Sequence, residues 1–457
     1  MKKLKILSFA TILFLVGCTT NKVSEDIQDS REEISEVVSN EDNSSGPGLI
    51  SVTPDSKANS SSSSGSSYTP REGDYSQQST NCKAYLDAMR AQHNTMEDDY
   101  RYIANNVINK STSVDIKNWY DTATWEHREL KSDHSWGVDV KIPDSIWNRS
   151  SVTKIDVQFG LKQDFSDATT IRVDRSTVQF INLQNLFSAK TYYWRMKGSE
   201  DQNYGESNTF TTGDYPRWIS CGGMYNVRDN GGYMTHYGKR IKQGLVFRGG
   251  EITHKAWATD HTFTGDVAAK EVFRNTMKIG VELDLRRTAD LGGGETYTSC
   301  MFAENGDIDW VNKSINSYGN GVNNDYRLIK DIFDLFANAD KKPVYYHCHG
   351  GADRTGIIGW LLNGLLGASY TDLCIDFELT SYSSIGGGDC KRSHLYKTGR
   401  YDDYAGFLSA MRNMKVNNQS IWNDSKLISE NVEAYLTKKA GVASSTITKI
   451  RQIMLED

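Results

Sequence analysis

The sequence predicts two folded domains, an all-β sandwich followed by an α/β domain whose central sheet is flanked by helices. Two patterns lead to this expectation. In residues 136–213, apolar and polar residues alternate over several short runs, as they do in half-buried strands. After residue 214, short apolar segments and longer amphipathic segments follow one another, which is typical of helices that pack on a sheet. A chain of 457 residues has room for both domains and for additional segments.

The first 17 residues have the features of a signal peptide. Three lysines among the first five residues precede an apolar run from Ile6 to Val16, which is too short for a stable membrane span. The run ends in Leu15-Val16-Gly17-Cys18, which resembles the bacterial lipobox and thereby implies cleavage before Cys18 and lipidation of that cysteine. The alternative is an ordinary secretory signal with an incidental cysteine. We expect an exported protein of the bacterial cell envelope, held on a membrane by its lipid and facing the periplasm or the cell surface.

Residues 18–135 predict a stalk and a helical linker region. Residues 18–80 include the run Ser60–Ser64 and few large apolar residues, so they cannot bury enough surface to offset the loss of chain entropy. We therefore expect a disordered, Ser-rich stalk there. In residues 81–135, the segment from Cys82 to Ile108 carries apolar residues at spacings of three and four or their sum, which predicts a helix.

The expected sandwich spans residues 136–213. Alternating apolar residues predict short strands at its start, at residues 155–161 and at residues 192–196. The segment from Leu186 to Tyr192, with Trp194 and the closing run Asn208–Thr212, resembles a fibronectin type III domain in which Tyr192 forms the tyrosine corner. Ser188 stands where that family usually has proline. The resemblance implies an immunoglobulin-like sandwich that spaces domains or binds a partner.

The segment from His347 to Gly356, with the sequence His-Cys-His-Gly-Gly-Ala-Asp-Arg-Thr-Gly, is the most informative part of the α/β domain. It lies between Pro343–Tyr346, a predicted buried strand, and Ile357–Leu366, a predicted apolar helix. The N–H groups of such a loop and the positive end of the helix can bind phosphate. The same dipoles lower the pKa of a thiol, so a Cys348 thiolate can attack phosphorus. The Arg354 fork can hold two phosphate oxygens and stabilise charge in the transition state.

This loop resembles the His-Cys-x5-Arg-Thr/Ser signature of the cysteine-dependent protein tyrosine phosphatases. Asp353, directly before Arg354, makes it similar to the bacterial tyrosine and phosphoinositide phosphatases whose loop ends in Gly-Lys-Asp-Arg-Thr-Gly. Further segments resemble blocks of that subgroup in the same order, namely Asn226–Tyr233, Gly244–Gly250 and Asp284–Arg286. The resemblance extends over roughly residues 226–454 and implies a phosphatase domain in residues 214–457. The positions that depart from the subgroup are Asn230 for Leu, Gly249 for Ser and Ala352 for Lys.

The resemblance implies the roles of the site residues. Cys348 would be the nucleophile, Arg354 would hold the phosphoryl group, and Asp353 would be the general acid, because no Trp-Pro-Asp sequence occurs upstream. The competing candidates for the acid are Asp307, Asp309 and Asp325. The loop would contact the substrate through His349, Gly350, Gly351, Ala352 and Thr355, and the Thr355 hydroxyl could donate to the thiolate. The supporting residues would be His347, which can orient the loop, and Arg228, Asp229 and Arg286, which either support the site or form structural ion pairs.

The implied chemistry needs no cofactor and no metal. A metal site at His347-Cys348-His349 is disfavoured, because adjacent residues of an extended segment point to opposite faces. The net charge of −6 gives no support for nucleic-acid binding. Of seven cysteines, an odd number remains after Cys18 and Cys348 are set aside, so complete internal pairing is impossible.

Three functions remain open at the level of the sequence. We favour a phosphatase that acts on phosphotyrosine or on another simple phosphomonoester. At position 352 an alanine replaces the lysine that would help bind the extra phosphates of an inositol lipid. The first alternative is a phosphatase of inositol phosphates or phosphoinositides, in which a protonated His349 partly replaces that lysine. The second alternative is a catalytically inactive lipoprotein that binds phosphate or serves in adhesion. The expected partners are a phosphorylated substrate and, through the lipid, a membrane.

Overall fold

The structure is a computed structural model that describes residues 137–212, 216–252, 267–287, 290, 298–340, 342–380, 383 and 401–457. The predicted signal peptide, Cys18, the Ser-rich stalk and the helix expected from Cys82 to Ile108 lie outside these residues. They therefore stay predictions. Within the described ranges, no helix combines the length and the apolar character needed to cross a lipid bilayer.

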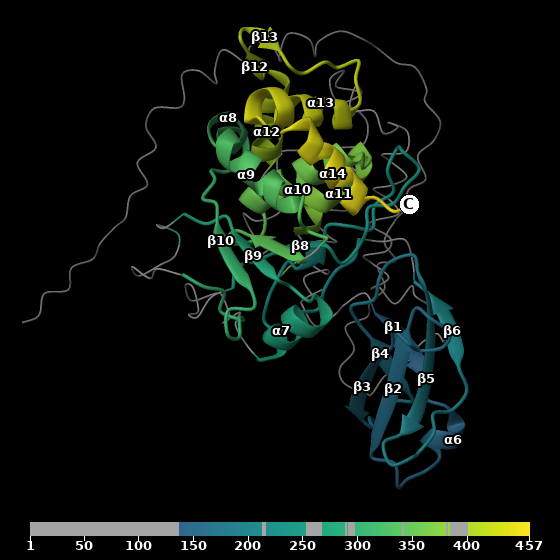
Figure 1. Cartoon of the computed structure of the whole chain (residues 1–457). Helices are drawn as coiled ribbons and strands as arrows, with labels where there is room; N and C mark the ends of the chain where they lie inside the picture. Colours follow the sequence, from purple (N-terminus) through teal and green to yellow (C-terminus); the bar gives the residue numbers. More distant parts are fainter. Residues whose placement is uncertain are drawn as a thin grey trace, which may run out of the picture. The chain divides into compact units, whose positions relative to one another are not determined.

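Residues 138–211 form two antiparallel sheets, drawn in blue and dark teal in Figure 1. The smaller sheet pairs β1 (Val138–Lys141) with β4 (Phe180–Leu183). The larger sheet has the order β3-β2-β5-β6, with strands at Thr169–Asp174, Lys154–Gly160, Thr191–Gly198 and Asn208–Thr211. A short helix, α6 (Asp144–Trp147), follows β1. Alternate residues of β5 are buried, and both sheets contribute side chains to one apolar core.

The hydroxyl of Tyr192 accepts a hydrogen bond from the backbone N–H of Phe187 at 2.8 Å. A tyrosine corner makes such a contact to the backbone a few residues upstream. The predicted strands at residues 155–161 and 192–196 are present, whereas β3 and β4 were not predicted. The fibronectin type III assignment stays a prediction, because unrelated families share the sandwich architecture.

The α/β domain is built on a five-stranded sheet of order β10-β9-β11-β8-β7. The strands are β7 (Arg228–Asp229), β8 (Val246–Gly249), β9 (Val281–Asp284), β10 (Asp309–Asn312) and β11 (Val344–His347). Strands β10, β9, β11 and β8 run parallel, and β7 pairs antiparallel with β8. This central sheet, with a strand directly before Cys348, confirms the predicted fold of the domain.

Helices cover both faces of the sheet, as the sequence predicts. In β11, Val344 and Tyr346 contribute to one apolar core and Tyr345 to another, because successive side chains of a strand point to opposite faces. Figure 1 shows α7 on the opposite side of the sheet from α9, α10 and α14. The first core contains the helices α8 (Tyr318–Asn324), α9 (Tyr326–Phe336), α10 (Asp353–Leu366), α11 (Tyr370–Leu379), α12 (Tyr401–Arg412), α13 (Ile428–Ala434), η8 (Tyr435–Ala440) and α14 (Ser444–Met454). The second contains α7 (Val267–Glu271) and η4 (Val272–Thr276), and a small hairpin joins β12 (Lys415–Val416) to β13 (Gln419–Ser420).

Helix α10 connects the core to the site. Its ten residues from Ile357 to Leu366 are all buried. A helix that is buried on every side lies in the centre of a domain, which explains why its sequence is apolar without an exposed polar face. The helix ends at Gly367, whose φ of +90° is the left-handed conformation of a C-terminal cap. The sequence predicted a start at Ile357, whereas the helix begins at Asp353. The first turn therefore carries the predicted acid and Arg354, and the Thr355 hydroxyl is placed beside them.

Candidate active site

The candidate site lies where the parallel strands β8, β9 and β11 end. In the register of the sheet, His347, the last residue of β11, lies opposite Asp284 of β9 and Gly249 of β8. The carboxyl ends of parallel strands meet at one edge, which is where open α/β sheets bind their ligands. The loops that follow these three strands therefore come together at the start of α10.

Cys348 directly follows β11 and is 2% exposed. Burial alone would raise the pKa of its thiol, but the positive charge of Arg354, together with a smaller effect of the polar groups of Thr355, outweighs burial and the opposing charge of Asp353. The pKa of Cys348 is therefore held below its ordinary value. Both the hydroxyl and the backbone N–H of Thr355 contribute. These are the surroundings of a nucleophilic cysteine.

Arg354 lies in the first turn of α10, and its Nη1 donates to a carboxylate oxygen of Asp290. Its side chain is 11% exposed. In the described part of the chain, the hydrogen bonds of this guanidinium run from Nη1 to Asp290 and to the carbonyl of Leu285, the latter at 3.4 Å. The opposite Nε–Nη2 edge has the fork geometry that holds two oxygens of a phosphoryl group.

Asp353 begins α10 and is half-buried. The hydroxyl of Tyr318, at the start of α8, donates a hydrogen bond to its Oδ1. The charge of Asp353 raises the pKa of Cys348. Asp353 thus lies close enough to the nucleophile for its charge to act on the thiol. A carboxyl beside the reacting group is where a general acid is needed.

The other candidates for the acid are committed elsewhere. Asp307 forms an ion pair with Arg274 at 2.6 Å, and Asp309 pairs with Lys342. Asp325 accepts the backbone N–H of Asn316 at 2.6 Å. Of the four, Asp353 is the one whose charge acts on Cys348.

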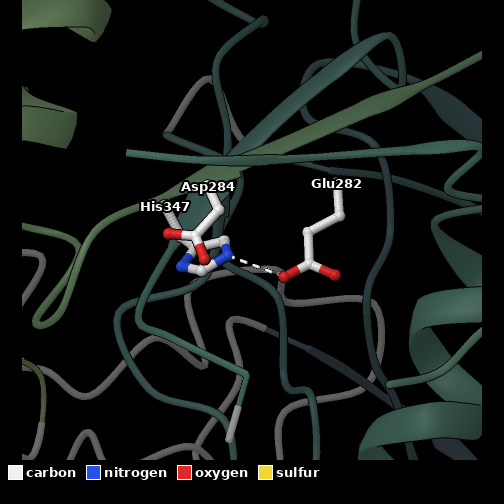
Figure 2. A group of neighbouring side chains, drawn as sticks. All are labelled: Glu282, Asp284 and His347. Carbon is white, nitrogen blue, oxygen red and sulfur yellow. Dashed lines mark hydrogen bonds and ion pairs between the residues drawn. The ribbon is translucent and has the colours of Figure 1, made fainter. Parts of the chain in front are cut away.

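His347 belongs to a buried cluster with Glu282 and Asp284, shown in Figure 2. Its Nε2 lies 2.9 Å from Glu282 Oε1, and its Nδ1 lies 3.0 Å from the backbone oxygen of Cys348. Burial lowers the pKa of His347, but Asp284 and Glu282 together raise it above the ordinary value. An imidazolium here can donate to both partners. This is the contact expected of a residue that orients the loop.

The same three side chains have metal-ligand atoms within 4.8 Å of one another. However, the Asp284 carboxylate already accepts from Arg286 Nε and Nη2, at 2.9 and 2.7 Å. Glu282 and the imidazole are paired with each other (Figure 2). We interpret the group as an ion-pair network that supports the loop.

The predicted supporting residues form buried ion pairs. Arg286 joins Asp284 to Glu251, and the same Glu251 oxygen lies 2.8 Å from His349 Nδ1. Asp229 pairs with Arg217 at 2.8 Å and accepts the backbone N–H groups of Gly231 and Gly244. It is thus a structural residue in these contacts.

Arg228 pairs with Asp376 at 2.7 Å and donates to Asn226. Asn226 in turn contacts the loop, so Arg228 supports the site through a neighbour.

The remaining predicted contact residues form the loop itself. Gly350, Gly351 and Ala352 lead from Cys348 to the start of α10. Gly351 has a φ of +66°, and a Cβ atom there would lie 2.2 Å from the backbone of Gly249. Only glycine fits at this close approach of the loop to β8.

Several residues that contact the loop or its side chains were not predicted from the sequence, namely Tyr225, Asn226, Arg248, Glu251, Glu282, Asp290 and Tyr318. Asn226 and Arg248 lie inside the segments that resemble family blocks, so a signal was present for them. Asp290 and Tyr318 stand 64 and 35 residues before their partners, and no motif marks them.

Residues 219–456, more than half of the chain, match the tyrosine phosphatase family. The chain belongs to this family. It is therefore a cysteine-based phosphatase, a hydrolase of phosphoesters that acts on phosphorylated substrates. The match covers the whole sheet, the loop with Cys348 and Arg354, and every helix from α7 to α14.

Among solved structures, the chain is similar to the core catalytic domain of the PP-IP phosphatase SIW14 from S. cerevisiae in complex with citrate. The sequences are 15% identical, the similarity covers 33% of this chain and 76% of that chain, and the TM-score is 0.22. A similarity at this level carries no argument about the substrate. No curated protein sequence matches the chain.

Proposed function

We propose that the chain hydrolyses phosphomonoesters, phosphotyrosine among them, through a thiophosphate intermediate on Cys348. In the first step, the thiolate forms a bond to phosphorus while the bond between phosphorus and the leaving oxygen breaks. Asp353 gives its proton to that oxygen. In the second step, water attacks phosphorus, Asp353 takes a proton from the water, and the sulfur–phosphorus bond breaks. Inorganic phosphate leaves, and the thiolate is restored.

The observation that carries this proposal is the set of groups gathered at the first turn of α10. The thiol of Cys348 has a lowered pKa, and the Arg354 fork lies close enough for its charge to act on the thiol. Both lie at the positive end of a 14-residue helix, where an anion is stabilised. A nucleophile and a binding site for phosphoryl oxygens are thus in one place, which supports attack of sulfur on phosphorus.

The contacts of His349 support simple phosphomonoesters over inositol phosphates. This imidazole lies 2.8 Å from the Glu251 carboxylate, which also pairs with Arg286. A charge that is shared with a carboxylate is a weaker attraction for a second phosphate group. Ala352 supplies no cation at the position where the resembling subgroup has lysine. Both features favour a substrate with one phosphate.

The experiment compares the full chain, kept in detergent and reductant, with its Cys348→Ser variant on a phosphotyrosine peptide and on inositol phosphates. We expect turnover of the peptide, with a loss of at least about 10⁴-fold in the variant. Cys300→Ser is the matched control, because Cys300 is also buried in the same domain. It should keep turnover near that of the wild type.

Each remaining outcome changes the proposal. Turnover of inositol phosphates alone would make them the substrate class in place of phosphotyrosine. Binding of phosphate without turnover of any substrate would support a binding module instead of an enzyme. Equal turnover in wild type and Cys348→Ser would contradict the chemistry on Cys348.

We propose further that the protein is exported and anchored in a membrane of the cell envelope by lipid on Cys18. The lipobox-like segment supports this, and the Ser-rich stalk gives the enzyme reach from the membrane. Cells that grow with labelled palmitate should incorporate label into the wild-type chain and not into Cys18→Ala. Label in the variant would contradict lipidation at this cysteine.

We also propose that residues 136–213 form a fibronectin type III-like module that spaces or binds without taking part in the chemistry. The hydrogen bond to the Tyr192 hydroxyl supports it. Tyr192→Phe should lower the free energy of unfolding by about 1 kcal/mol and leave turnover of a small phosphomonoester unchanged. A loss of turnover in the folded variant would show that the module contributes to the site.

A further inference from the structure

The loop after Cys348 turns its backbone carbonyls toward donors behind it. The carbonyl of His349 accepts the backbone N–H of Glu251 at 3.0 Å. The carbonyls of Gly350 and Gly351 both accept from the side-chain amide of Asn226, at 3.0 Å each. In a trans peptide the carbonyl and the next N–H point in opposite directions, and the described residues contain no cis peptide bond. The N–H groups of residues 350–352 therefore face away from these donors, as in a backbone site for an anion.

The amide of Asn226 is fixed in this orientation. Asn226 is 1% exposed and has a φ of +60°, a conformation that asparagine tolerates better than most residues. Its Oδ1 accepts from Arg228 Nη1 at 2.5 Å. Because arginine can only donate, the atom that faces it is the amide oxygen, and the atom that faces the loop is the amide nitrogen. Arg228 thus makes Asn226 a donor toward both carbonyls.

A second donor reaches the same loop. Arg248, on β8, donates from Nη2 to the carbonyl of Gly351 at 3.0 Å, while its Nη1 pairs with Asp376. Arg228 pairs with the other oxygen of Asp376 at 2.7 Å. Both arginine side chains are at most 1% exposed.

In the described part of the chain, the ion pairs of these two buried arginines run to one shared carboxylate, Asp376 of α11. Two guanidiniums against one carboxylate leave a positive charge behind the loop. The charge of Arg248 interacts with Cys348 in the sense that favours a thiolate. An oxyanion bound in the loop would gain from the same charge.

We propose that Asn226 and Arg248 are positioning residues of the phosphate-binding loop. They hold the carbonyls of Gly350 and Gly351 from behind, so that the N–H groups of the loop face the phosphoryl oxygens, and Arg228 and Asp376 hold them in turn. The proposal rests on the proposed function, because it explains how the loop binds the phosphoryl group. Neither residue touches the reacting atoms.

The test uses Asn226→Gly in the full chain. Glycine adopts a φ of +60° without strain, so this variant loses the amide and keeps the backbone. The matched control is Asn418→Gly, because Asn418 has a φ of +62° and is exposed in the turn between β12 and β13. The measurements are the dissociation constant of inorganic phosphate, the pH midpoint of Cys348 alkylation, and the thermal midpoint of unfolding.

We expect Asn226→Gly to bind phosphate about tenfold more weakly or worse and to move the alkylation midpoint of Cys348 to higher pH. Asn418→Gly should match the wild type in both. A second variant, Asn226→Asp, keeps the shape of the side chain but has no donor for the carbonyls. It should bind phosphate at least as weakly as Asn226→Gly, whereas a residue that only fills space would tolerate the exchange.

Phosphate affinity and an alkylation midpoint equal to the wild type in both Asn226 variants would overturn the proposal, whatever their thermal stability. Its failure is distinct from failure of the proposed function. A wild-type chain that binds phosphate but hydrolyses nothing, with binding weakened in the variants, would support the positioning role and overturn the proposed catalysis.

Discussion

Two buried cysteines of the α/β domain, Cys348 and Cys300, have surroundings of opposite charge. Their exposed fractions are similar, 2% and 4%, and burial raises the pKa of both thiols. At Cys348, Arg354 and Thr355 outweigh burial and hold the pKa below its ordinary value. At Cys300, the carboxylate of Glu282 adds to burial and holds the pKa far above it. The degree of burial therefore does not decide which thiol is a nucleophile. The neighbouring charges decide it.

Glu282 lies between the two regions. It raises the pKa of Cys300 directly, and it also contacts His347 at 2.9 Å, one residue before Cys348. The His347 imidazole lies between that carboxylate and the backbone oxygen of Cys348. One carboxylate thus keeps one thiol protonated and, through an imidazole, supports the backbone of the other.

The largest effect should follow from removing the cation beside Cys348. We expect Arg354→Gln to lower kcat by at least about 10³-fold and to raise the pKa of Cys348 toward that of an ordinary thiol. Steady-state kinetics and pH-dependent alkylation measure the two effects. Arg287→Gln is the control, because Arg287 also pairs with Asp290 but its side chain is 57% exposed. If the Arg354 variant kept a low alkylation midpoint, the assigned cause would be wrong.

The second effect separates the two roles of Asp353. Asp353→Asn should lower kcat by about 10²-fold or more for a poor leaving group, and much less for a good one. It should also lower the pKa of Cys348, because the charge of Asp353 raises that pKa. The result expected of Asp353→Asn is therefore a lower kcat together with a lower pKa of Cys348. Asp307→Asn, at a competing candidate, should leave both quantities unchanged.

The third effect concerns Glu282. Glu282→Gln should lower the pKa of Cys300, because the carboxylate is one cause of its rise. It should also reduce the free energy of unfolding by about 2 kcal/mol at acidic pH, since a buried hydrogen bond to a charged imidazole is weakened. Alkylation of Cys300 and urea denaturation check the two parts.

The effect of Glu282→Gln on the free energy of unfolding should depend on pH. The pKa of His347 is raised in the folded state, so its stabilising contribution is fully present below the pKa of an unfolded histidine, about 6.5. The contribution is lost as the pH rises through the folded pKa. The difference between wild type and Glu282→Gln should therefore shrink with rising pH. A constant difference would contradict an imidazolium at His347.

The smallest effect should come from Thr355. Thr355→Val keeps the shape of the side chain and removes the hydroxyl, so we expect a modest rise in the pKa of Cys348 and a decrease of about five- to tenfold in kcat. Thr355→Ser keeps the hydroxyl and should remain near the wild type. Equal rates for the valine and serine variants would show that the hydroxyl does not stabilise the thiolate.

The local parts of the site could be predicted from the sequence. The strand, the loop and the helix around Cys348 are contiguous, and their apolar pattern and glycines define them. The start of α10 was the exception, because the polar residues Asp353 and Arg354 hide the first helical turn from an apolar pattern.

The long-range partners could not be predicted. Glu282 stands 65 residues before His347 and Asn226 stands 125 residues before Gly351, and the strand order β9-β11-β8-β7 brings these pairs together. A sequence pattern gives the period of a strand but not its neighbours in the sheet. Arg228 is an example. It supports Asn226 while it is paired with Asp376, which comes from a helix distant in the sequence.

The most direct test of catalysis by Cys348 is to trap the intermediate. The full chain is mixed with a phosphotyrosine peptide, quenched in acid within one turnover and analysed by peptide mass spectrometry. We expect a phosphate adduct on the peptide that contains Cys348, present in the wild type, accumulated in Asp353→Asn and absent from Cys348→Ser. Hydrolysis without any adduct on Cys348, or an adduct on another residue, would contradict it.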